Sequence, residues 1–418
     1  FVLLDQHTGE VKALCGGRGE KTASLTLNRA SNVYRQPGSA FKVITAFAPA
    51  LDACGATLGT VYYDAPYTIG TKTFRNWWNS GYGFTGYSSI RDGIIYSMNI
   101  VAVRCLMETV TPQLGVEYAE NMGITSLTKD DLGAATALGG ITKGVSNLEM
   151  TAAYASIAND GIYTRPVFFT RILDHNGKIL IDNEPETHRV LKDSTAFLLT
   201  DAMVDVVTKG TGGSVNFGGM AIAGKTGTTS DYNDVWFAGF TPYYTATTWT
   251  GFDNNEKLAK GEERKLAQKL WRAVMSQIHA ELPNEPFSVP PGIVTATVCS
   301  KSGKLPIPGL CDTQGTLKTE YFADGTVPSE SCDVHYQGAI CQYNGMPACE
   351  LCPFKIEGVL ELTPVEDVSL QSGSSVTTQI TNPDGSVSSV TQPANQTNSC
   401  PHNAEFFAVP GWEAIQEQ

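Results

Sequence analysis

The sequence predicts an α/β fold of the α+β kind, in which an antiparallel sheet is flanked by helices and accompanied by an all-helical subdomain. Short segments rich in β-branched and aromatic residues, separated by turns, open the chain and return after residue 219. Such segments are typical of antiparallel strands. Apolar residues at helical spacing fill much of the stretch between them. With 418 residues, the chain is long enough for two or three structural units with a buried core.

The elements follow one another in a clear order. The chain opens with a hairpin that turns at Thr8-Gly9, and a helix runs from the Pro37-Gly38 boundary to Gly55. That helix is apolar nearly all round, as a central helix is. Residues 56–90, rich in Tyr, Trp, Gly, Ser and Thr, are interpreted as an irregular segment or short strands with aromatic packing. Later come helices at 90–110, 115–124 and 147–160, a hairpin at 167–181, a helix at 193–207, strands at 220–229, 235–242 and 245–253, and a helix at 265–282.

The character of the chain changes near residue 290. We expect a first domain over residues 1–290 and a Cys-rich, Ser/Thr-rich, partly flexible extension over residues 291–418. Within the extension, residues 366–398 are predicted to be a flexible linker rather than a small exposed β unit. The chain opens directly on a strand, and we interpret it as a fragment whose natural N-terminus, with any membrane anchor, lies upstream.

Seven of the ten cysteines lie in the extension. An exported protein uses such a group for disulfides, whereas a reducing compartment favours a metal. The pair Cys349 and Cys352 has metal-ligand spacing, and His335 and His402 lie near other cysteines, so zinc is the alternative. Because no second C-x-x-C completes a four-ligand set, we favour disulfides and expect no metal site. Since seven is odd, at least one of these thiols is free or pairs elsewhere.

Charge and hydropathy exclude several classes of function. The formal net charge is -13, from 29 Lys+Arg and 42 Asp+Glu, and no run of basic residues could follow a nucleic-acid backbone. We therefore expect no nucleic-acid partner. No window approaches the roughly 20 apolar residues of a transmembrane helix.

Ser39 and Lys42 form the first candidate pair. If a helix begins at Ser39, a spacing of three places both side chains on one face, where the lysine amine can touch the hydroxyl. A serine is a poor nucleophile without a base, and lysine is a base only if burial or a second cation lowers its pKa. Apolar neighbours such as Phe41 and Val43 favour burial of Lys42. The structural alternative is that Ser39 caps the helix and Lys42 reaches water.

Ser97 and Asn99 form the second pair, in a polar triplet between two apolar runs. Buried Ser and Asn side chains must be hydrogen-bonded, which a structural network or a catalytic site satisfies equally well. A second hydroxyl beside a Ser/Lys pair could pass a proton to a leaving group. The Asn99 amide could hold a peptide carbonyl.

Lys225, Thr226, Gly227 and Thr228 form the third motif, which has two interpretations. From Gly219 onward the letters match the phosphate loop G-x-x-x-x-G-K-[ST]. A phosphate loop needs a helix starting at its lysine, yet Met-Ala-Ile-Ala before the motif is strand-like and no helix signal follows. On a strand, Thr226 and Thr228 share one face and could bind a carboxylate with Lys225. Gly227 would let a substrate backbone approach, and the N–H groups of Ser39 and Thr228 could form an oxyanion hole.

The three motifs are persuasive together. S-x-x-K, S-x-N and K-T-G-T in this order form the motif set of penicillin-binding proteins and serine β-lactamases. The stretches FVLLDQHTGEVKALCGG, NRASNVYRQPGSAFK, LGGITKGVSNLEMTAAYASIANDG and AGKTGTTSDYNDVWFAGFTP look like the transpeptidase domain of class A, bifunctional penicillin-binding proteins. The resemblance covers residues 1 to about 290. The tail is similar only in general terms to cysteine-bearing extensions of clostridial-type members.

This resemblance implies a penicillin-binding-protein/serine β-lactamase-like fold and a peptidoglycan D,D-transpeptidase without a cofactor. It implies that a stem peptide ending in D-Ala-D-Ala acylates Ser39, and that β-lactams do the same and stay there. Lys42 would take the serine proton, and Ser97 with Lys225 would relay it to the leaving amine. The substrate would be oriented by Asn99 and held through its carboxylate by Thr226 and Thr228.

The resemblance also implies a cellular setting. The chain would act on the outer face of a bacterial cytoplasmic membrane, held by an upstream anchor, with a glycosyltransferase domain before it and the cell-wall synthesis machinery as partner. Three alternatives remain. A D,D-carboxypeptidase differs only in using water as acceptor, and a non-catalytic penicillin- or peptidoglycan-binding module would lack the chemistry. A β-lactamase needs a glutamate that activates water, and Glu184-Pro-Glu186 resembles that motif, but it lies far past Ser97 and is interpreted as solvated.

Overall fold

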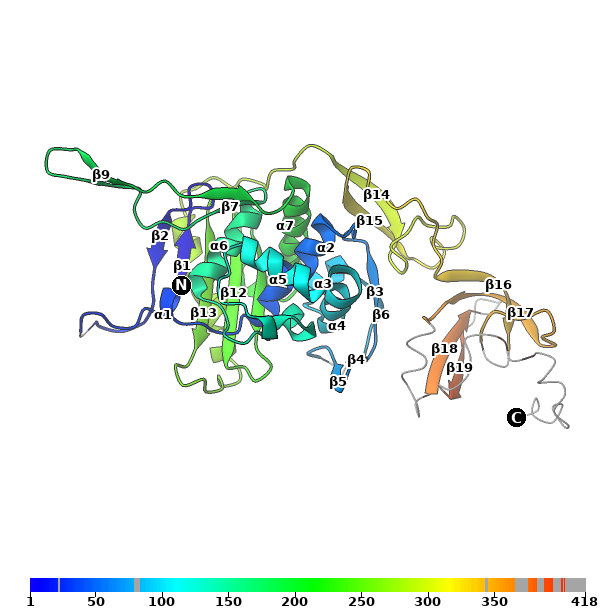
Figure 1. Cartoon of the computed structure of the whole chain (residues 1–418). Coiled ribbons are helices and arrows are strands. Elements are labelled where there is room, and N and C mark those ends of the chain that lie inside the picture. The colour runs from blue at the N-terminus through cyan, green and yellow to red at the C-terminus, as the bar shows by residue number, and fades with distance from the viewer. Residues whose placement is uncertain are drawn as a thin grey trace.

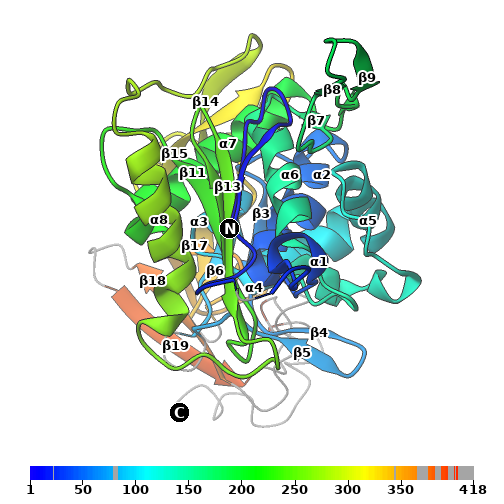
Figure 2. The same ribbon diagram turned by 90° about the vertical axis from the view of Figure 1, so that its left-hand side faces the viewer.

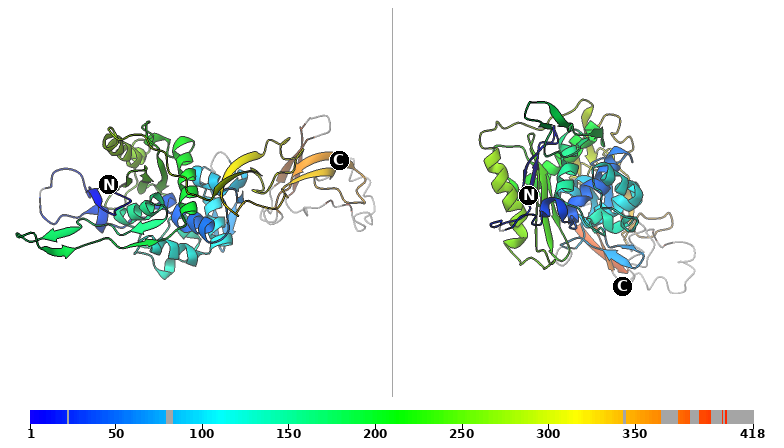
Figure 3. Two further views of the ribbon diagram at one scale, coloured as in Figure 1. Left: turned by 90° about the horizontal axis from the view of Figure 1, so that it is seen from above. Right: turned by 60° about the vertical axis from the view of Figure 1, so that its left-hand side comes forward.

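The body of the molecule is an antiparallel sheet between helices, and a C-terminal extension of strands leads away from it (Figure 1). The computed structural model describes residues 1–21, 23–78, 83–342, 345–364, 375–381, 387–393, 400 and 402. The β8–β9 hairpin and the extension project from opposite ends of the body (Figure 3). Among the described residues, no helix combines the length and apolar character needed to cross a membrane.

The central sheet has five strands in the order β11-β12-β13-β1-β2, and every neighbouring pair is antiparallel. The opening hairpin therefore joins strands that lie more than 200 residues later, through Val2 opposite Thr247. The strand bounds are β1 Val2–Leu4, β2 Val11–Leu14, β11 Ala223–Thr228, β12 Asp234–Phe240 and β13 Thr245–Gly251. The strand predicted at 220–229 is shorter than expected and begins at Ala223. Gly218 and Gly219 have positive φ, and the chain between them and β11 is irregular.

The two faces of the sheet bury different residues, as the period of two requires. Trp236, Ala238 and Phe240 of β12 join the large core built by the central helices. The alternate residues Val235 and Phe237 join a second core beneath α8 (Leu266–Ile278), where Phe237 meets Trp271 edge-to-face at 5.1 Å. Figure 2 shows α8 on one side of the sheet and α6 with α2 on the other. The predicted sheet flanked by helices is confirmed.

The helices match the expected positions, but two of the predicted helices are interrupted. The segment predicted as one helix over 90–110 is divided at Ser97, whose φ of +56° ends the first helix. The helix after Pro37 is also composite, with a 3₁₀ turn η1 (Gly38–Ala40) and a π-helical stretch η2 (Val43–Phe47) before α2. The remaining bounds are α1 Arg29–Asn32, α2 Ala48–Asp52, α3 Ile90–Ile95, α4 Asn99–Arg104, η3 Cys105–Val110, α5 Pro112–Asn121, η4 Lys129–Asp131, η5 Ala134–Leu138, α6 Asn147–Ala158, α7 Asp193–Thr208, η6 Gly213–Val215 and η7 Glu263–Lys265.

Several two-stranded sheets accompany the central sheet and its helices. The aromatic-rich segment after residue 56 forms two of them, β3 with β6 and β4 with β5, which agrees with the expectation of short strands. The hairpin predicted at 167–181 is confirmed as β8 and β9. The bounds are β3 Val61–Asp64, β4 Tyr67–Ile69, β5 Lys72–Phe74, β6 Gly86–Ser89, β7 Ile162–Thr164, β8 Arg171–Leu173, β9 Ile179–Asp182 and β10 Thr187–Arg189.

The extension consists of a two-stranded and a four-stranded sheet. β14 (Ile293–Cys299) pairs with β15 (Leu317–Ala323), and β16 (His335–Cys341) pairs with β17 (Lys355–Glu361). β18 (Ser375–Thr381) and β19 (Val387–Pro393) complete the second sheet, so these two segments form a β unit and the expected flexible linker is wrong for them. The rest of 366–398 lies outside the described residues. The division near residue 290 stays a prediction.

The expected disulfides of the extension are not formed. None of the ten cysteines, all of which lie among the described residues, is joined to another by a disulfide. Six of the seven extension cysteines instead gather with His335 and His402 in two buried groups, and Cys349 lies outside them. The missing second C-x-x-C was a poor argument against such groups. Their residues come together from separate strands and loops rather than from one local motif.

A buried charge network fastens the extension to the helical body. Arg91 of α3 donates from Nε at 2.7 Å and from a terminal nitrogen at 2.5 Å to the carboxylate of Glu320 on β15. The same guanidinium reaches Asp201 at 2.6 Å and Asp205 at 2.9 Å, both on α7. Arg91 and Glu320 are 6% and 3% exposed. A planar guanidinium can satisfy several carboxylates at once, which a lysine cannot.

Arg91→Leu should therefore destabilise the chain strongly, because it leaves three carboxylates close together without their cation. Removing one partner of a buried ion pair costs about 3–5 kcal/mol. Urea unfolding of the whole chain, followed by tryptophan fluorescence, measures the effect. The matched control is Arg171→Leu, which removes an exposed pair with Asp182 and should cost less than about 1 kcal/mol. Equal losses in the two variants would contradict a stabilising role for the Arg91 network.

Candidate active site

Ser39 lies in the 3₁₀ turn that begins the central helix, and its position depends on backbone geometry on both sides. Gly38 before it has φ of +56°, a conformation that glycine adopts without strain. Tyr154 of α6 donates its buried hydroxyl to the carbonyl of Ala40 at 2.7 Å, and Trp236 donates its indole N–H to the carbonyl of Gln36 at 2.9 Å. The Ser39 side chain is half-buried, whereas Lys42, one turn later, is completely buried.

Ser97 occupies the break between α3 and α4. It is 4% exposed and has φ of +56°, which is uncommon for a residue with a side chain. Such a conformation costs about 1–3 kcal/mol and persists only where the surroundings hold it. Asn99 follows as the first residue of α4, so the predicted polar triplet turns its groups toward Lys42 instead of continuing one helix.

Lys225 to Thr228 lie on β11, at the edge of the central sheet. Lys225 is completely buried, Thr226 is half-buried and Thr228 is exposed, so the two threonines share the outer face as predicted. Lys225 sits inside a strand and not at the start of a helix. The phosphate-loop interpretation is therefore wrong, because no helix N-terminus is present to bind a phosphate.

The three motifs converge on the Ser97 hydroxyl. Lys225 donates from Nζ to Ser97 Oγ at 2.8 Å. Lys42 donates from Nζ to the carbonyl of Ser97 at 2.7 Å, to Asn99 Oδ1 at 2.7 Å and to Ser97 Oγ at a longer 3.4 Å. One hydroxyl thus lies between two lysine amines that are far apart in the sequence. Chemically, a proton can pass between two amines through a hydroxyl placed in this way.

The electrostatics of the two lysines suit a base. Burial lowers the pKa of Lys225 to about 7. Burial, and next the charge of Lys225, lower the pKa of Lys42 well below its ordinary value. Within the described part of the chain, neither amine has a carboxylate partner that would restore its charge. A neutral amine at neutral pH is what a serine nucleophile requires.

The expected contact between Lys42 and Ser39 is not among the hydrogen bonds of the described residues. The Lys42 amine is instead held by Ser97 and Asn99. Hydrogen bonds of a free enzyme are often long or misaligned and tighten when substrate binds. Lys42 nevertheless follows Ser39 by one helical turn, so the two side chains start from the same side of the segment.

Two glycines allow strand β11 to pack against the serine turn. A Cβ on Gly227 would meet the carbonyl oxygen of Pro37 at 2.3 Å, and a Cβ on Gly38 would meet the backbone of Thr228 at 2.6 to 2.9 Å. Gly227 was expected to make room for a substrate backbone, and this expectation is wrong. Gly227 lies on the same side of the strand as the buried Lys225, and its lack of a side chain makes room for the turn that carries Ser39. The close approach brings the Thr228 backbone beside the segment that carries Ser39.

Two site residues were missed by the sequence analysis. Thr211, in the loop after α7, shares a hydrogen bond of 2.9 Å with the Thr226 hydroxyl. Asn76 accepts at Oδ1 from the N–H of Asn99 at 2.7 Å and of Ile100 at 3.2 Å, and so holds the start of α4. Both come from irregular segments, where no periodicity marks a side chain as inward. Glu184, the alternative water-activating residue, is exposed to solvent in the loop after β9, as expected.

Comparison with known proteins identifies the family of the chain. Residues 1–276 match the family model of the penicillin binding protein transpeptidase domain, and residues 289–337 match that of the penicillin-binding protein 1A C-terminal domain. Penicillin-binding protein 1A of Clostridium botulinum strain Hall is 36% identical over 364 residues, covering 84% of this chain and 44% of that protein. Penicillin-binding protein 1A/1B of Bacillus subtilis is 32% identical over 347 residues, covering 78% and 37%. The chain thus spans less than half of these curated relatives.

Solved structures agree with the fold. Penicillin-binding protein 1A from Haemophilus influenzae superposes with a TM-score of 0.68 at 28% identity, covering 79% of this chain and 54% of that one. PonA1 from Mycobacterium tuberculosis, solved in complex with penicillin V, gives 0.60 at 26% identity, covering 69% and 80%. The predicted resemblance and fold are therefore confirmed, and the chain belongs to the penicillin-binding protein family, of which it carries the transpeptidase domain.

Proposed function

We propose that this chain is a serine D,D-transpeptidase that cross-links peptidoglycan stem peptides and is acylated by β-lactams. The observation that carries the proposal is the Ser97 hydroxyl held between Lys225 and Lys42. That arrangement connects a buried amine beside the nucleophile to a second amine on the strand where a peptide would lie. Neither a simple binding module nor a structural core requires two buried, uncompensated lysines.

The first half of the proposed reaction forms an acyl-enzyme. Neutral Lys42 takes the proton of Ser39 Oγ, which attacks the carbonyl carbon between the two terminal D-alanines of a stem peptide. The N–H groups of Ser39 and Thr228 stabilise the negative oxygen of the tetrahedral intermediate. The C–N bond then breaks, and the Ser97 hydroxyl, which is also hydrogen-bonded to Lys225, gives its proton to the leaving amine while protonated Lys42 replaces it. D-Alanine departs and the peptide remains as an ester of Ser39.

The second half transfers the acyl group. An amine of a neighbouring stem attacks the ester carbonyl, its proton returns through the same groups, and Ser39 is restored with a new amide bond between stems. A carboxypeptidase differs only because water is the acceptor. A β-lactamase would need a base for water in the site, and Glu184 lies instead in the loop after β9. We propose the outer face of the bacterial cytoplasmic membrane as the place of action, with the cell-wall synthesis machinery as partner.

The substrate would be held at both ends of the scissile bond. Thr226 and Thr228 present their hydroxyls on the outer face of β11 to the terminal carboxylate, and Thr211 fixes the Thr226 hydroxyl. Asn99 would orient the peptide with its amide. Its Oδ1 accepts from Lys42 and its Nδ2 donates to the carbonyl of Arg75 at 2.9 Å, which leaves the second Nδ2 hydrogen for a substrate carbonyl.

Ser39→Ala should abolish covalent labelling by penicillin, because the variant lacks the nucleophile. Intact-mass measurement of the wild-type chain should show one adduct, and peptide mapping should place it on Ser39. Ser31→Ala, a nearby serine without a proposed role, is the matched control and should label normally. An adduct that survives in Ser39→Ala would show that another residue is the nucleophile, and no adduct in the wild type would favour a non-catalytic module.

The rate of acylation should rise as pH increases through the neutral range. Burial lowers the pKa of both lysines, that of Lys225 to about 7, so raising the pH deprotonates the relay and creates the base. Below the controlling pKa the rate should fall by about tenfold per pH unit. Stopped-flow acylation by a chromogenic β-lactam measures the profile. Lys42→Met should lose about 10²–10⁴-fold in rate at the optimum, whereas exposed Lys269→Met should keep the wild-type profile.

Stability changes in the same direction and must be separated from catalysis. Unfolding returns a buried lysine to its ordinary pKa, so the unfolded chain binds more protons between the lowered and ordinary values, and stability rises with pH across that window. Circular dichroism at each pH shows whether the protein is folded. A flat acylation profile in folded protein would contradict a lysine base.

A further inference from the structure

The extension contains two buried side-chain groups that the proposed catalysis does not use. Each combines three cysteines with one histidine, and in each the four potential ligand atoms lie within 4.8 Å of one another. The first group is Cys299, Cys311, Cys332 and His335; the second is Cys341, Cys352, Cys400 and His402. We propose that each group binds a structural zinc ion. The proposal does not depend on the transpeptidase activity.

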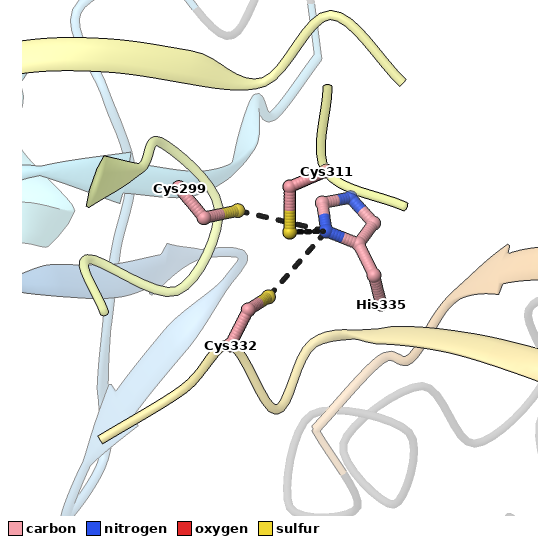
Figure 4. A group of neighbouring side chains, drawn as sticks. All are labelled: Cys299, Cys311, Cys332 and His335. Atoms are coloured by element: carbon pink, nitrogen blue, oxygen red, sulfur yellow. Dashed lines mark hydrogen bonds between the residues drawn. The ribbon is translucent and has the colours of Figure 1, made fainter. Parts of the chain in front are cut away.

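The first group has the dimensions of a tetrahedral site. The sulfurs of Cys299 and Cys311 lie 3.5 Å, and that of Cys332 3.4 Å, from one atom, His335 Nδ1 (Figure 4). In a zinc tetrahedron, bonds of about 2.3 Å to sulfur and about 2.0–2.1 Å to nitrogen place each sulfur about 3.5 Å from the nitrogen. The observed spacing therefore equals the edge of such a tetrahedron.

Neither disulfide bonding nor hydrogen bonding accounts for the first group. A disulfide has sulfurs about 2.05 Å apart, and the cysteines are free thiols. A single ring nitrogen carries one proton or one lone pair, so it cannot make a full hydrogen bond with three thiols at once. A cation bound by all four ligand atoms explains why the three sulfurs lie around His335 Nδ1. Cysteine with histidine in a closed four-ligand set is the composition of structural zinc sites.

The surroundings support thiolate ligands. The N–H of Ile307 donates to Cys311 Sγ at 3.2 Å. Donors around ligand atoms orient them and stabilise their charge. Cys299 and Cys311 are completely buried, and Cys332 and His335 are less than 9% exposed. A buried, closed set of ligands with no open position fits a structural ion rather than a catalytic one.

The zinc would reinforce the small apolar cluster around the first group. The apolar cluster around the group contains, apart from the cysteines, only Val334 as a buried residue among those described, with Tyr87 and Ile307 packed partly against it. A cluster of so few apolar side chains buries little surface by itself, and a metal is a common reinforcement of such a small core. Because Cys299 ends β14, the ion would also fix the β14–β15 pair that carries Glu320 to Arg91.

The second group rests on its own observations. The sulfurs of Cys341 and Cys400 lie 3.5 and 3.1 Å from His402 Nδ1. Cys349 lies beside it, with its sulfur 3.3 Å from Cys400 Sγ, and belongs to the C-x-x-C pair with Cys352. The ion would join the end of β16 to residues about 60 positions later in the chain, across a sheet whose apolar cluster has Ile340 and Leu360 as its buried members.

Metal analysis of the whole chain, purified without oxygen and without chelators, tests both sites. Inductively coupled plasma mass spectrometry should find two zinc ions per chain. Cys332→Ser or His335→Asn should remove one, and Cys352→Ser or His402→Asn should remove the other. Cys15→Ser changes an exposed thiol outside both groups and is the matched control, which should keep two ions.

Cobalt provides a second readout, in which the number of sites is counted on the wild-type chain. The wild-type chain, stripped with a chelator under reducing conditions and titrated with Co²⁺ alone, should take up two equivalents. Its spectrum should show thiolate-to-cobalt charge transfer and tetrahedral d–d bands. A chain that holds no zinc and gives no thiolate bands, or one whose extension cysteines are disulfide-bonded by mass, would overturn the proposal. If the wild-type chain takes up only one equivalent, the same titration of the variants identifies the group that binds it. The proposal is then overturned for the other group, whose variants still take up one equivalent.

Discussion

The site depends on burying two lysine amines next to one serine hydroxyl. An ammonium group in an apolar interior is strongly disfavoured, so the protein holds these amines at a lowered pKa instead of pairing them with carboxylates. Their hydrogen bonds go to neutral groups, the hydroxyl and carbonyl of Ser97 and the amide oxygen of Asn99. A carboxylate in any of these places would restore the charge and remove the base. The low pKa of the two amines therefore depends on the absence of a carboxylate partner among the described residues as well as on the residues that contact them.

Much of the helical body serves that burial. The helix after Pro37 is surrounded by apolar side chains, which desolvate Lys42, and β11 carries Lys225 into the same interior from the sheet. The break at Ser97 then supplies hydrogen bonds to both amines, at the expense of a strained backbone. Asn76 secures the start of α4, and Tyr154 secures the turn that carries Ser39. Gly38 and Gly227 remove the side chains that would separate the turn from the strand.

The extension follows different physical rules. It has small apolar clusters, and a buried ion pair between Glu320 and the Arg91 guanidinium links it to the body. The proposed zinc sites would supply the cohesion that a larger core supplies elsewhere. The proposed metal binding also accounts for the odd cysteine count, because it leaves Cys349 outside the two groups. Oxidation of these thiols would compete with metal binding, so the redox state of the compartment would decide the stability of this part of the chain.

The sequence alone determined the class of fold, the order of its main elements and the candidate catalytic residues, because periodicity and the spacing within each motif are local properties. Ser39 with Lys42, Ser97 with Asn99, and Lys225 with the threonines could each be found by reading along the chain. Their convergence on the Ser97 hydroxyl could not, since it requires contacts between segments 55 and 128 residues apart. The roles of Thr211, Asn76 and Gly227, and the gathering of the extension cysteines around His335 and His402, were likewise decided only by the tertiary structure. Side chains from loops and separate strands leave no periodic trace, and only packing determines which of them meet.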